Sequence, residues 1–360
     1  MNNMAFMRNL GILSEVDRKS QSTINAKKLI NKTIKKSREE AKTDKCFYCG
    51  KKVDSFCNSH SIPAFCLRNI AIDGEVLTPN SIIKIPVVDE FSGIKSAGTF
   101  RLICRECDSK VFSDYENPNN YKQKPTNIML SQIALKNNVK AISKRWFESF
   151  FYKNSYEIAG IFNNDLLQRE YVTSLDLKEY IDDFNKAKKS LQKFNDEYYM
   201  CYYKKLDYVV PIACQIPLAL IFDFNGNVIN NIYNQSPNYK IKNIHINIFP
   251  LNDSSVIFLF INDGDKRYRN FYKQFNKLPL EEQLKALTFI IFAYSEDVFF
   301  SKKILTEVNN SPELTNAAQS DSGIISFTTN FSPLEKCREN FDLSLREKVP
   351  NLLSEKYKIK

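Results

Sequence analysis

Apolar residues at helical spacing dominate the middle of the chain. They recur between Thr126 and Tyr152, and after a loop the pattern continues from Thr173 to Tyr199. We therefore predict a helical region over residues 126–205, in which Ser174 is a candidate N-cap. Residues 22–45 carry cations interleaved with Leu29, Ile30 and Ile34, which predicts an amphipathic basic helix within an N-terminal segment, residues 1–44. Such a helix can lie on a phosphate backbone or cap the next unit.

After residue 205 the pattern becomes typical of strands. The apolar run 209–224, a turn signal at 225–227 and residues 228–233 predict one hairpin. Residues 245–263 predict a second one, and Pro279 precedes a helix expected to run from Leu280 to about Lys303. We predict antiparallel hairpins plus a helix for residues 206–308. Residues 309–360 are too weakly patterned for an assignment.

Residues 45–125 consist of short segments broken by turn residues, and they contain two CxxC pairs. Cys46 and Cys49 form the first pair, which Gly50 follows, and Cys104 and Cys107 form the second. Two such pairs predict a tetrahedral zinc site, although a redox disulfide is the alternative for each pair. Because four thiolates leave no open coordination position, we expect this zinc to be structural.

The composition of the chain indicates the compartment and the kind of partner expected for this zinc unit. The longest apolar runs are far shorter than the roughly 20 residues of a membrane-spanning helix, so no membrane segment is expected. The first residues lack the pattern of a secretory signal, so we expect the nine cysteines to be reduced in a cytoplasm, where pairs at short spacing indicate metal or redox chemistry. The net charge of +10 favours an anionic partner, although it also raises solubility.

A histidine lies between the two cysteine pairs, in the segment Ser59-His60-Ser61-Ile62-Pro63. Asp108 follows the last cysteine directly, and Glu116 lies further along the same segment. This order resembles the zinc-containing HNH endonucleases of the treble-clef, ββα-metal type, over residues 45–118. The SHSIP segment and the acidic residues after the second CxxC are similar to those of bacterial proteins of unassigned role that are described as HNH-like.

The resemblance implies a phosphodiesterase site. His60 matches the general base that activates water, Asp108 stands where an asparagine is usual, and Glu116 lies near the distal ligand of a catalytic Mg²⁺ or Mn²⁺. Ser59 departs from the family, which commonly has an acidic residue there. The alternatives are that His60 is a packed histidine or a substitute zinc ligand, that Asp108 is a helix N-cap, and that Glu116 is a solvated residue.

The sequence therefore predicts an α+β protein in which an HNH-like zinc module joins a helical block and an antiparallel sheet region. The leading functional hypothesis is a metal-dependent DNA or RNA endonuclease, with a role in defence against phage. The alternative is a catalytically inactive zinc protein that binds nucleic acid, or a protein partner through residues 126–308. Two mixed clusters of cations and aromatic residues, 144–146 and 265–273, can serve either nucleic-acid contacts or packing.

Overall fold

The computed structural model describes residues 21–83, 91–159, 164–193, 195–236, 238–320 and 333–360. Helices and strands are segregated along much of the chain, and the strands pair in an antiparallel manner, which confirms the predicted α+β class. Among the described helices, none combines the length and the apolarity needed to cross a membrane.

A seven-stranded antiparallel sheet forms the centre of the molecule. Its strand order is β3-β2-β9-β6-β7-β8-β5. The strands are β2 (Glu75–Leu77), β3 (Phe91–Gly93), β5 (Tyr198–Leu206), β6 (Ile212–Leu218), β7 (Ile244–Pro250), β8 (Ser255–Asn262) and β9 (Val298–Phe300). Because β2 and β3 lie between the two cysteine pairs in sequence, the segment 45–125 contributes directly to this sheet.

The second predicted hairpin corresponds to β7 and β8, which pair from Ile244↔Ile261 to Pro250↔Ser255. The first is reduced to an isolated bridge between Phe222 and Val228 around the 223–227 turn, and β6 pairs instead with β7 and β9. Successive side chains of each strand point to opposite faces of the sheet, so the interior is divided into two hydrophobic cores. On β8, Ile257, Leu259 and Ile261 face one core, whereas Val256, Phe258 and Phe260 face the other.

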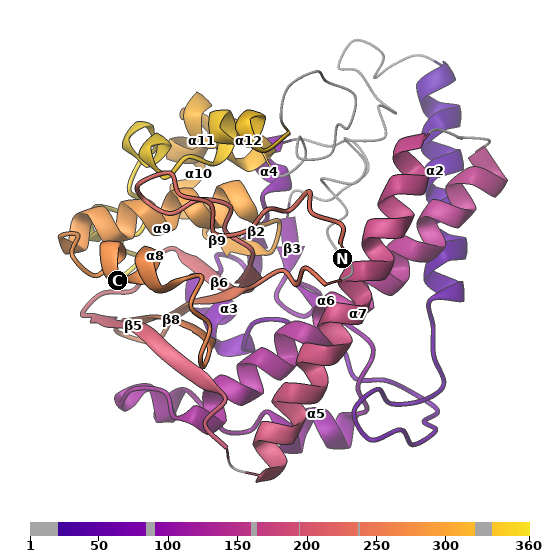
Figure 1. Cartoon of the computed structure of the whole chain (residues 1–360), viewed down its shortest axis with the longest axis horizontal. Helices are drawn as coiled ribbons and strands as arrows, with labels where there is room; N and C mark the ends of the chain where they lie inside the picture. Colours follow the sequence, from indigo (N-terminus) through magenta and orange to yellow (C-terminus); the bar gives the residue numbers. More distant parts are fainter. Residues whose placement is uncertain (1–20, 84–90, 160–163, 194, 237, 321–332) are drawn as a thin grey trace.

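Helices near the C-terminal end of the chain cover the first core (Figure 1). The longest is α9 (Leu280–Tyr294), which begins directly after Pro279 as predicted but ends well before Lys303. Buried residues of the tail, among them Leu314, Phe341 and Leu352, also enter this core. The other described helical elements here are α8 (Arg269–Phe275), α10 (Leu305–Asn309), α11 (Pro312–Ser320), α12 (Pro333–Phe341), η3 (Lys302–Ile304), η5 (Leu343–Lys348) and η6 (Glu355–Tyr357).

The second core lies between the sheet and the helical block. Helices α6 (Asn127–Ala159) and α7 (Asn164–Lys193) pack side by side, and α2 (Gln21–Glu40) packs on α6 (Figure 1). Since α7 begins at Asn164, Ser174 is inside a helix, where its hydroxyl donates to the Tyr171 carbonyl, and is not an N-cap. Residues 1–20 of the predicted basic segment lie outside the described residues.

Short elements build the cysteine-bearing region against this second core. A two-stranded sheet pairs β1 (Ser59–His60) with β4 (Thr99–Phe100). The helical pieces are α3 (Ala64–Ile70), α4 (Asn80–Ile83), α5 (Arg105–Val111) and η2 (Pro118–Lys122). The buried side chains of Phe65, Phe112 and Tyr121 join this region to the sheet and to α6.

Candidate metal centre and adjoining ion-pair cluster

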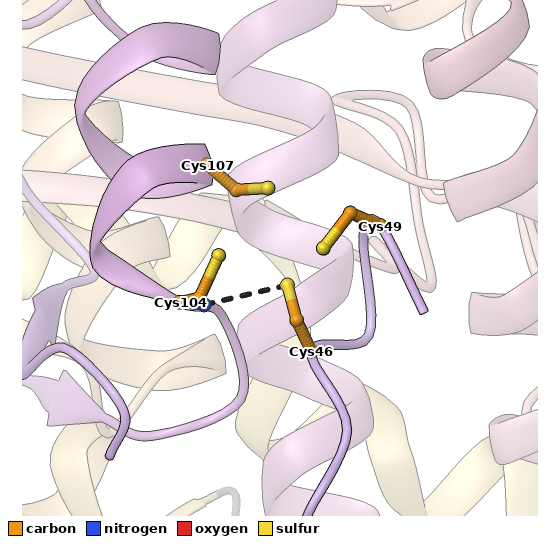
Figure 2. Close-up of side chains that lie close together, drawn as sticks. All are labelled: Cys46, Cys49, Cys104 and Cys107. Atoms are coloured by element: carbon orange, nitrogen blue, oxygen red, sulfur yellow. Dashed lines mark hydrogen bonds between the residues drawn. The ribbon is translucent and has the colours of Figure 1, made fainter. Parts of the chain in front are cut away.

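The four predicted cysteines converge on one point. Cys46 and Cys49 come from one loop, Cys104 and Cys107 come from the start of α5, and the four sulfur atoms point toward one another (Figure 2). All four Sγ atoms lie within 4.8 Å of one another. The arrangement can therefore hold a metal ion, and the structure brings together all four cysteines that the sequence predicted as zinc ligands.

Local backbone geometry explains why the first pair can turn toward the second. Gly50 adopts φ +73°, a left-handed conformation that favours glycine, and its N–H donates to the Cys46 carbonyl at 2.8 Å. Cys104 occupies the N-cap position of α5, and its backbone N–H donates to Cys46 Sγ at 3.3 Å. The sulfur of Cys46 is thus stabilised by a helix terminus whose amide groups lack partners within the helix.

The chemistry of the four donors fits a soft divalent cation. Sulfurs bound at about 2.3 Å to one tetrahedral zinc would be separated by about 3.8 Å, and the four sulfurs here all lie within 4.8 Å of one another. Burial, together with hydrogen bonds that the Cys107 thiol donates to Cys104 and Cys49, raises the pKa of this thiol. Four clustered thiolates need a cation to neutralise them. A metal ion bound by all four cysteines would cross-link a loop that includes β1, β2 and β3 and thereby stabilise it.

Aromatic contacts fix this loop on the helical block. The Phe47 ring makes edge contacts with Trp146 of α6 and Phe184 of α7, at centroid distances of 5.5 and 4.8 Å. Lys188 donates to the Tyr48 carbonyl and lies 4.7 Å from the Tyr48 ring centroid. Residues 144–146 accordingly serve packing and ion pairing, since Arg145 pairs with Asp176 at 2.8 Å.

Asp108 and Glu116 come together, but they do so around a lysine. Lys136 Nζ lies 2.8 Å from Asp108 Oδ1 and 3.0 Å from Glu116 Oε1. The side chain of Lys136 has no exposed surface, and its ammonium lies 3.8 Å from the centroid of the Phe112 ring. Asp108 is the fourth residue of α5, so the N-cap alternative is wrong because Cys104 holds that position.

Ser59 completes this cluster. Its hydroxyl donates to Asp108 Oδ1 and accepts from Lys136 Nζ at 2.8 Å. Cys57 Sγ donates to Asp108 Oδ2 at 3.5 Å. The serine that departs from the HNH pattern is therefore a fully buried member of a hydrogen-bonded network. We call Ser59, Asp108, Glu116 and Lys136 the Lys136 cluster.

His60 is oriented away from this cluster. Successive residues of a strand project to opposite faces, and His60 follows Ser59 directly in β1. The ring Nε2 lies 2.9 Å from the carbonyl oxygen of Ile94, which can only accept, so Nε2–H is the donor. The structure thus brings Asp108 and Glu116 together and gives His60 a separate, half-buried position on the β1–β4 sheet.

The electrostatics of the cluster favour a stable ion pair. Burial opposes ionisation of Asp108, but the Lys136 ammonium and its hydrogen bonds outweigh burial and lower the pKa of this carboxyl. Burial and the neighbouring Asp108 raise the pKa of the Cys57 thiol. Asp108 is thus a carboxylate at neutral pH, paired with an ammonium that has three protons for three nearby oxygen acceptors.

Lys136 is not among the site residues predicted from the sequence. A signal was present, because Lys136 lies three residues after Ile133 and three before Val139, on a predicted apolar helix face. A lysine at such a position needs a counterion when it is buried. Its partners lie 20 and more positions away in the sequence, however, so helical periodicity could not identify them.

The cluster 265–273 is largely used for packing. Phe271 is fully buried, and Arg267 donates to the Lys240 carbonyl at 2.8 Å while its guanidinium lies over the Tyr239 ring. Phe271 therefore has no face to offer to a nucleic-acid base.

No family model, curated protein or solved structure matches the chain.

Proposed function

We propose that this chain is a zinc-stabilised nucleic-acid-binding protein, with the outer face of α2 as its contact surface. The observation that carries the proposal is a stripe of four exposed cations, Lys28, Lys32, Lys35 and Arg38. Within the part of the chain that the structure describes, none of the four has an ion-pair partner. We call these residues the α2 stripe.

The spacing of the α2 stripe places its members on one side of the helix. Steps of three and four residues keep side chains within one face, and the stripe extends over about 15 Å of helix axis. Thr33 and Ser37 lie on the opposite side, where they are buried against α6, and Asn154 donates to Ser37 Oγ at 3.0 Å. The helix is thus held by its polar buried face while its cations point to solvent. A phosphate backbone, with its regular negative charge, complements such a row.

The Lys136 cluster favours binding over hydrolysis. A nuclease of the predicted type needs Asp108 and Glu116 to hold a divalent cation near His60. In this chain an ammonium lies between the two carboxylates, and His60 faces Ile94. Replacing the ammonium with Mg²⁺ would leave a buried lysine without counterions, which is costly. We therefore assign Ser59, Asp108, Glu116 and Lys136 a structural role.

Zinc is the metal that we propose for the four-cysteine site. Four thiolates select zinc over hard cations such as Mg²⁺, and zinc has no redox chemistry of its own. A reducing compartment such as the cytoplasm fits this proposal, because oxidised cysteines cannot bind the metal.

The test is a binding titration at several salt concentrations with labelled duplex DNA, single-stranded DNA and RNA. Each phosphate contact contributes roughly 0.7–0.9 to the slope of log K against the logarithm of the salt concentration. Replacing all four residues of the α2 stripe with glutamine should therefore reduce the magnitude of this slope by about three to four. The matched control replaces four exposed lysines outside α2, namely Lys277, Lys336, Lys348 and Lys356. Equal loss of affinity in both variants would contradict the role of the α2 stripe, because the protein would then attract nucleic acid only through its overall positive charge.

The second candidate function is the endonuclease. It is favoured by one observation, the convergence of Asp108 and Glu116 beside the cysteine cluster. Incubation of the protein with plasmid and RNA in Mg²⁺ or Mn²⁺, next to a His60→Ala variant, separates the two functions. Cleavage by the wild type that is lost in His60→Ala would establish the nuclease. Absence of cleavage by both proteins would favour the nucleic-acid-binding function.

A further inference from the structure

A cavity of about 320 Å³ lies away from the cysteine cluster, between the helical block and the sheet. Its walls come from α6, α7, the segment 215–221 that includes the end of β6, and the turn 295–297 that follows α9. This volume is at the lower end of the range for small-molecule sites, about 300–1,000 Å³. The α2 stripe, which carries the function proposed above, does not line this cavity.

The charges in the cavity wall cancel in pairs. Lys140 pairs with Asp297 at 2.5 Å, and Lys144 pairs with Glu296 at 3.5 Å. Arg145 pairs with Asp176 across the α6–α7 interface. A ligand of high net charge would have to break one of these pairs and leave a partly buried charge without its partner. The lining therefore favours a ligand with no net charge.

Two polar groups in the wall retain unused hydrogen-bonding capacity. Gln215 is almost completely buried, and its Oε1 atom has no hydrogen-bond partner among the described residues, whereas its Nε2 donates to Asn137 Oδ1 at 3.0 Å. The Lys140 ammonium contacts one carboxylate oxygen, which leaves protons available for a further acceptor. Asn137, the partner of Gln215, lies one helical turn from Lys140 on α6, and all three residues line the cavity.

The remaining wall is apolar and aromatic. Leu218, Ala219 and Ile221 line the cavity, as do Tyr180 and Tyr233. A flat molecule can pack against these surfaces while its edge supplies a donor to Gln215 and an acceptor to Lys140. A nucleobase combines a flat apolar face with adjacent donor and acceptor groups on one edge.

We propose that this cavity binds a nucleobase, either in a free nucleoside or in a nucleic-acid strand. The test is isothermal titration calorimetry of the full, zinc-loaded chain with adenosine, guanosine, cytidine and uridine. At least one nucleoside should bind with a Kd below about 1 mM. Absence of binding for all four, or binding of free amino acids in their place, would overturn the proposal.

Two variants locate the binding. Ala141 lines the cavity, so Ala141→Leu should fill it and weaken nucleoside binding at least tenfold, whereas Ser149→Leu on the same helix, outside the lining, should leave Kd unchanged. Gln215→Met removes the free acceptor at similar side-chain length and should also weaken binding at least tenfold. If Ala141→Leu and Ser149→Leu bind equally well with unchanged thermal midpoints, the cavity is not the site.

A single-stranded oligonucleotide distinguishes the two sources of the base. Loss of oligonucleotide affinity in Ala141→Leu, parallel to the loss for the nucleoside, assigns the cavity to a base of a strand. Unchanged oligonucleotide affinity, together with lost nucleoside binding, assigns it to the free nucleoside.

Discussion

The ammonium of Lys136 lies 2.8 Å from Oδ1 of Asp108, the residue that directly follows the metal-ligand candidate Cys107. This contact connects the N-terminal third of α6 with α5, which Cys104 caps and which contains Cys107. A lysine that is distant in the sequence therefore contacts the residue next to the Cys104–Cys107 pair.

The first prediction concerns this ion pair. Lys136→Met should lower the free energy of unfolding by about 3–5 kcal/mol, because Asp108 and Glu116 would lose the ammonium that neutralises them. Urea unfolding followed by circular dichroism measures this change. The triple variant Lys136→Met, Asp108→Asn, Glu116→Gln should recover most of the loss, since no unpaired charge remains in it.

Lys110 provides the matched control for Lys136. It pairs with Glu106 on the same helix α5, but both side chains are largely exposed. Lys110→Met should leave the unfolding midpoint unchanged because water screens this pair. A Lys136→Met variant as stable as Lys110→Met would contradict the structural role of the Lys136 cluster.

The second prediction concerns the metal. Purified protein should contain one zinc per chain, measured by mass spectrometry of the metal or by a colorimetric chelator assay. Cys49→Ser should lower zinc content to well below one per chain and destabilise residues 45–125, because structural zinc binding contributes directly to folding. Cys66→Ala, at a buried cysteine outside the cluster, should retain full zinc content. Wild-type protein without zinc would refute the assignment.

The third prediction concerns His245. This residue of β7 is buried, its Nδ1 accepts from Asn137 Nδ2 at 3.0 Å, and its ring stacks on Phe260. Burial lowers its pKa to about 3. In the unfolded chain a histidine has a pKa near 6.5, so the unfolded state binds the extra proton as the pH falls below that value. The contribution of His245 to stability is therefore complete above about pH 6.5 and is lost progressively toward pH 3.

Urea titrations between pH 4 and 6 measure this contribution. His245→Phe preserves the ring stack and should reduce the slope of unfolding free energy against pH by up to about 1.4 kcal/mol per pH unit. His60→Gln removes the other histidine of the chain and serves as the comparison. Identical slopes for wild type and His245→Phe would show that His245 is not held neutral by the fold.

The fourth prediction compares two glycines that both have positive φ. Gly50→Ala should cost about 1–2 kcal/mol of stability, because φ is +73° but no atom lies within 4 Å of the added Cβ. Gly98→Ala should cost at least about 3 kcal/mol, since its Cβ would lie 2.5 Å from Ser61 Oγ and 2.9 Å from the Phe299 ring. Thermal unfolding of the two variants gives the order, and the reverse order would contradict the packing of β4 on the sheet.

The sequence predicted those features that depend on local spacing. The CxxC pairs identified the cysteine cluster because metal ligands of this type occur in short, fixed intervals, and helical periodicity identified most of α6. The sequence did not predict that Ser59 and His60 point to opposite faces of β1, with Ser59 toward α6. This depends on which face of a two-residue strand meets α6. Helical periodicity also did not indicate that the lysine on α6 would face Asp108 and Glu116, since both carboxylates come from another part of the chain.

The position of β2 in the central sheet has a consequence for biosynthesis. Lys302, which follows β9, bonds to Glu75 of β2 at 2.8 Å, a contact that spans 227 positions in the sequence. While the ribosome is still synthesising the second half of the chain, β2 can pair only with β3, because β9, its neighbour on the other side, has not yet been made. Early capture of zinc would hold this segment together until β9 emerges, so metal supply during translation should influence how much of the protein reaches its native state.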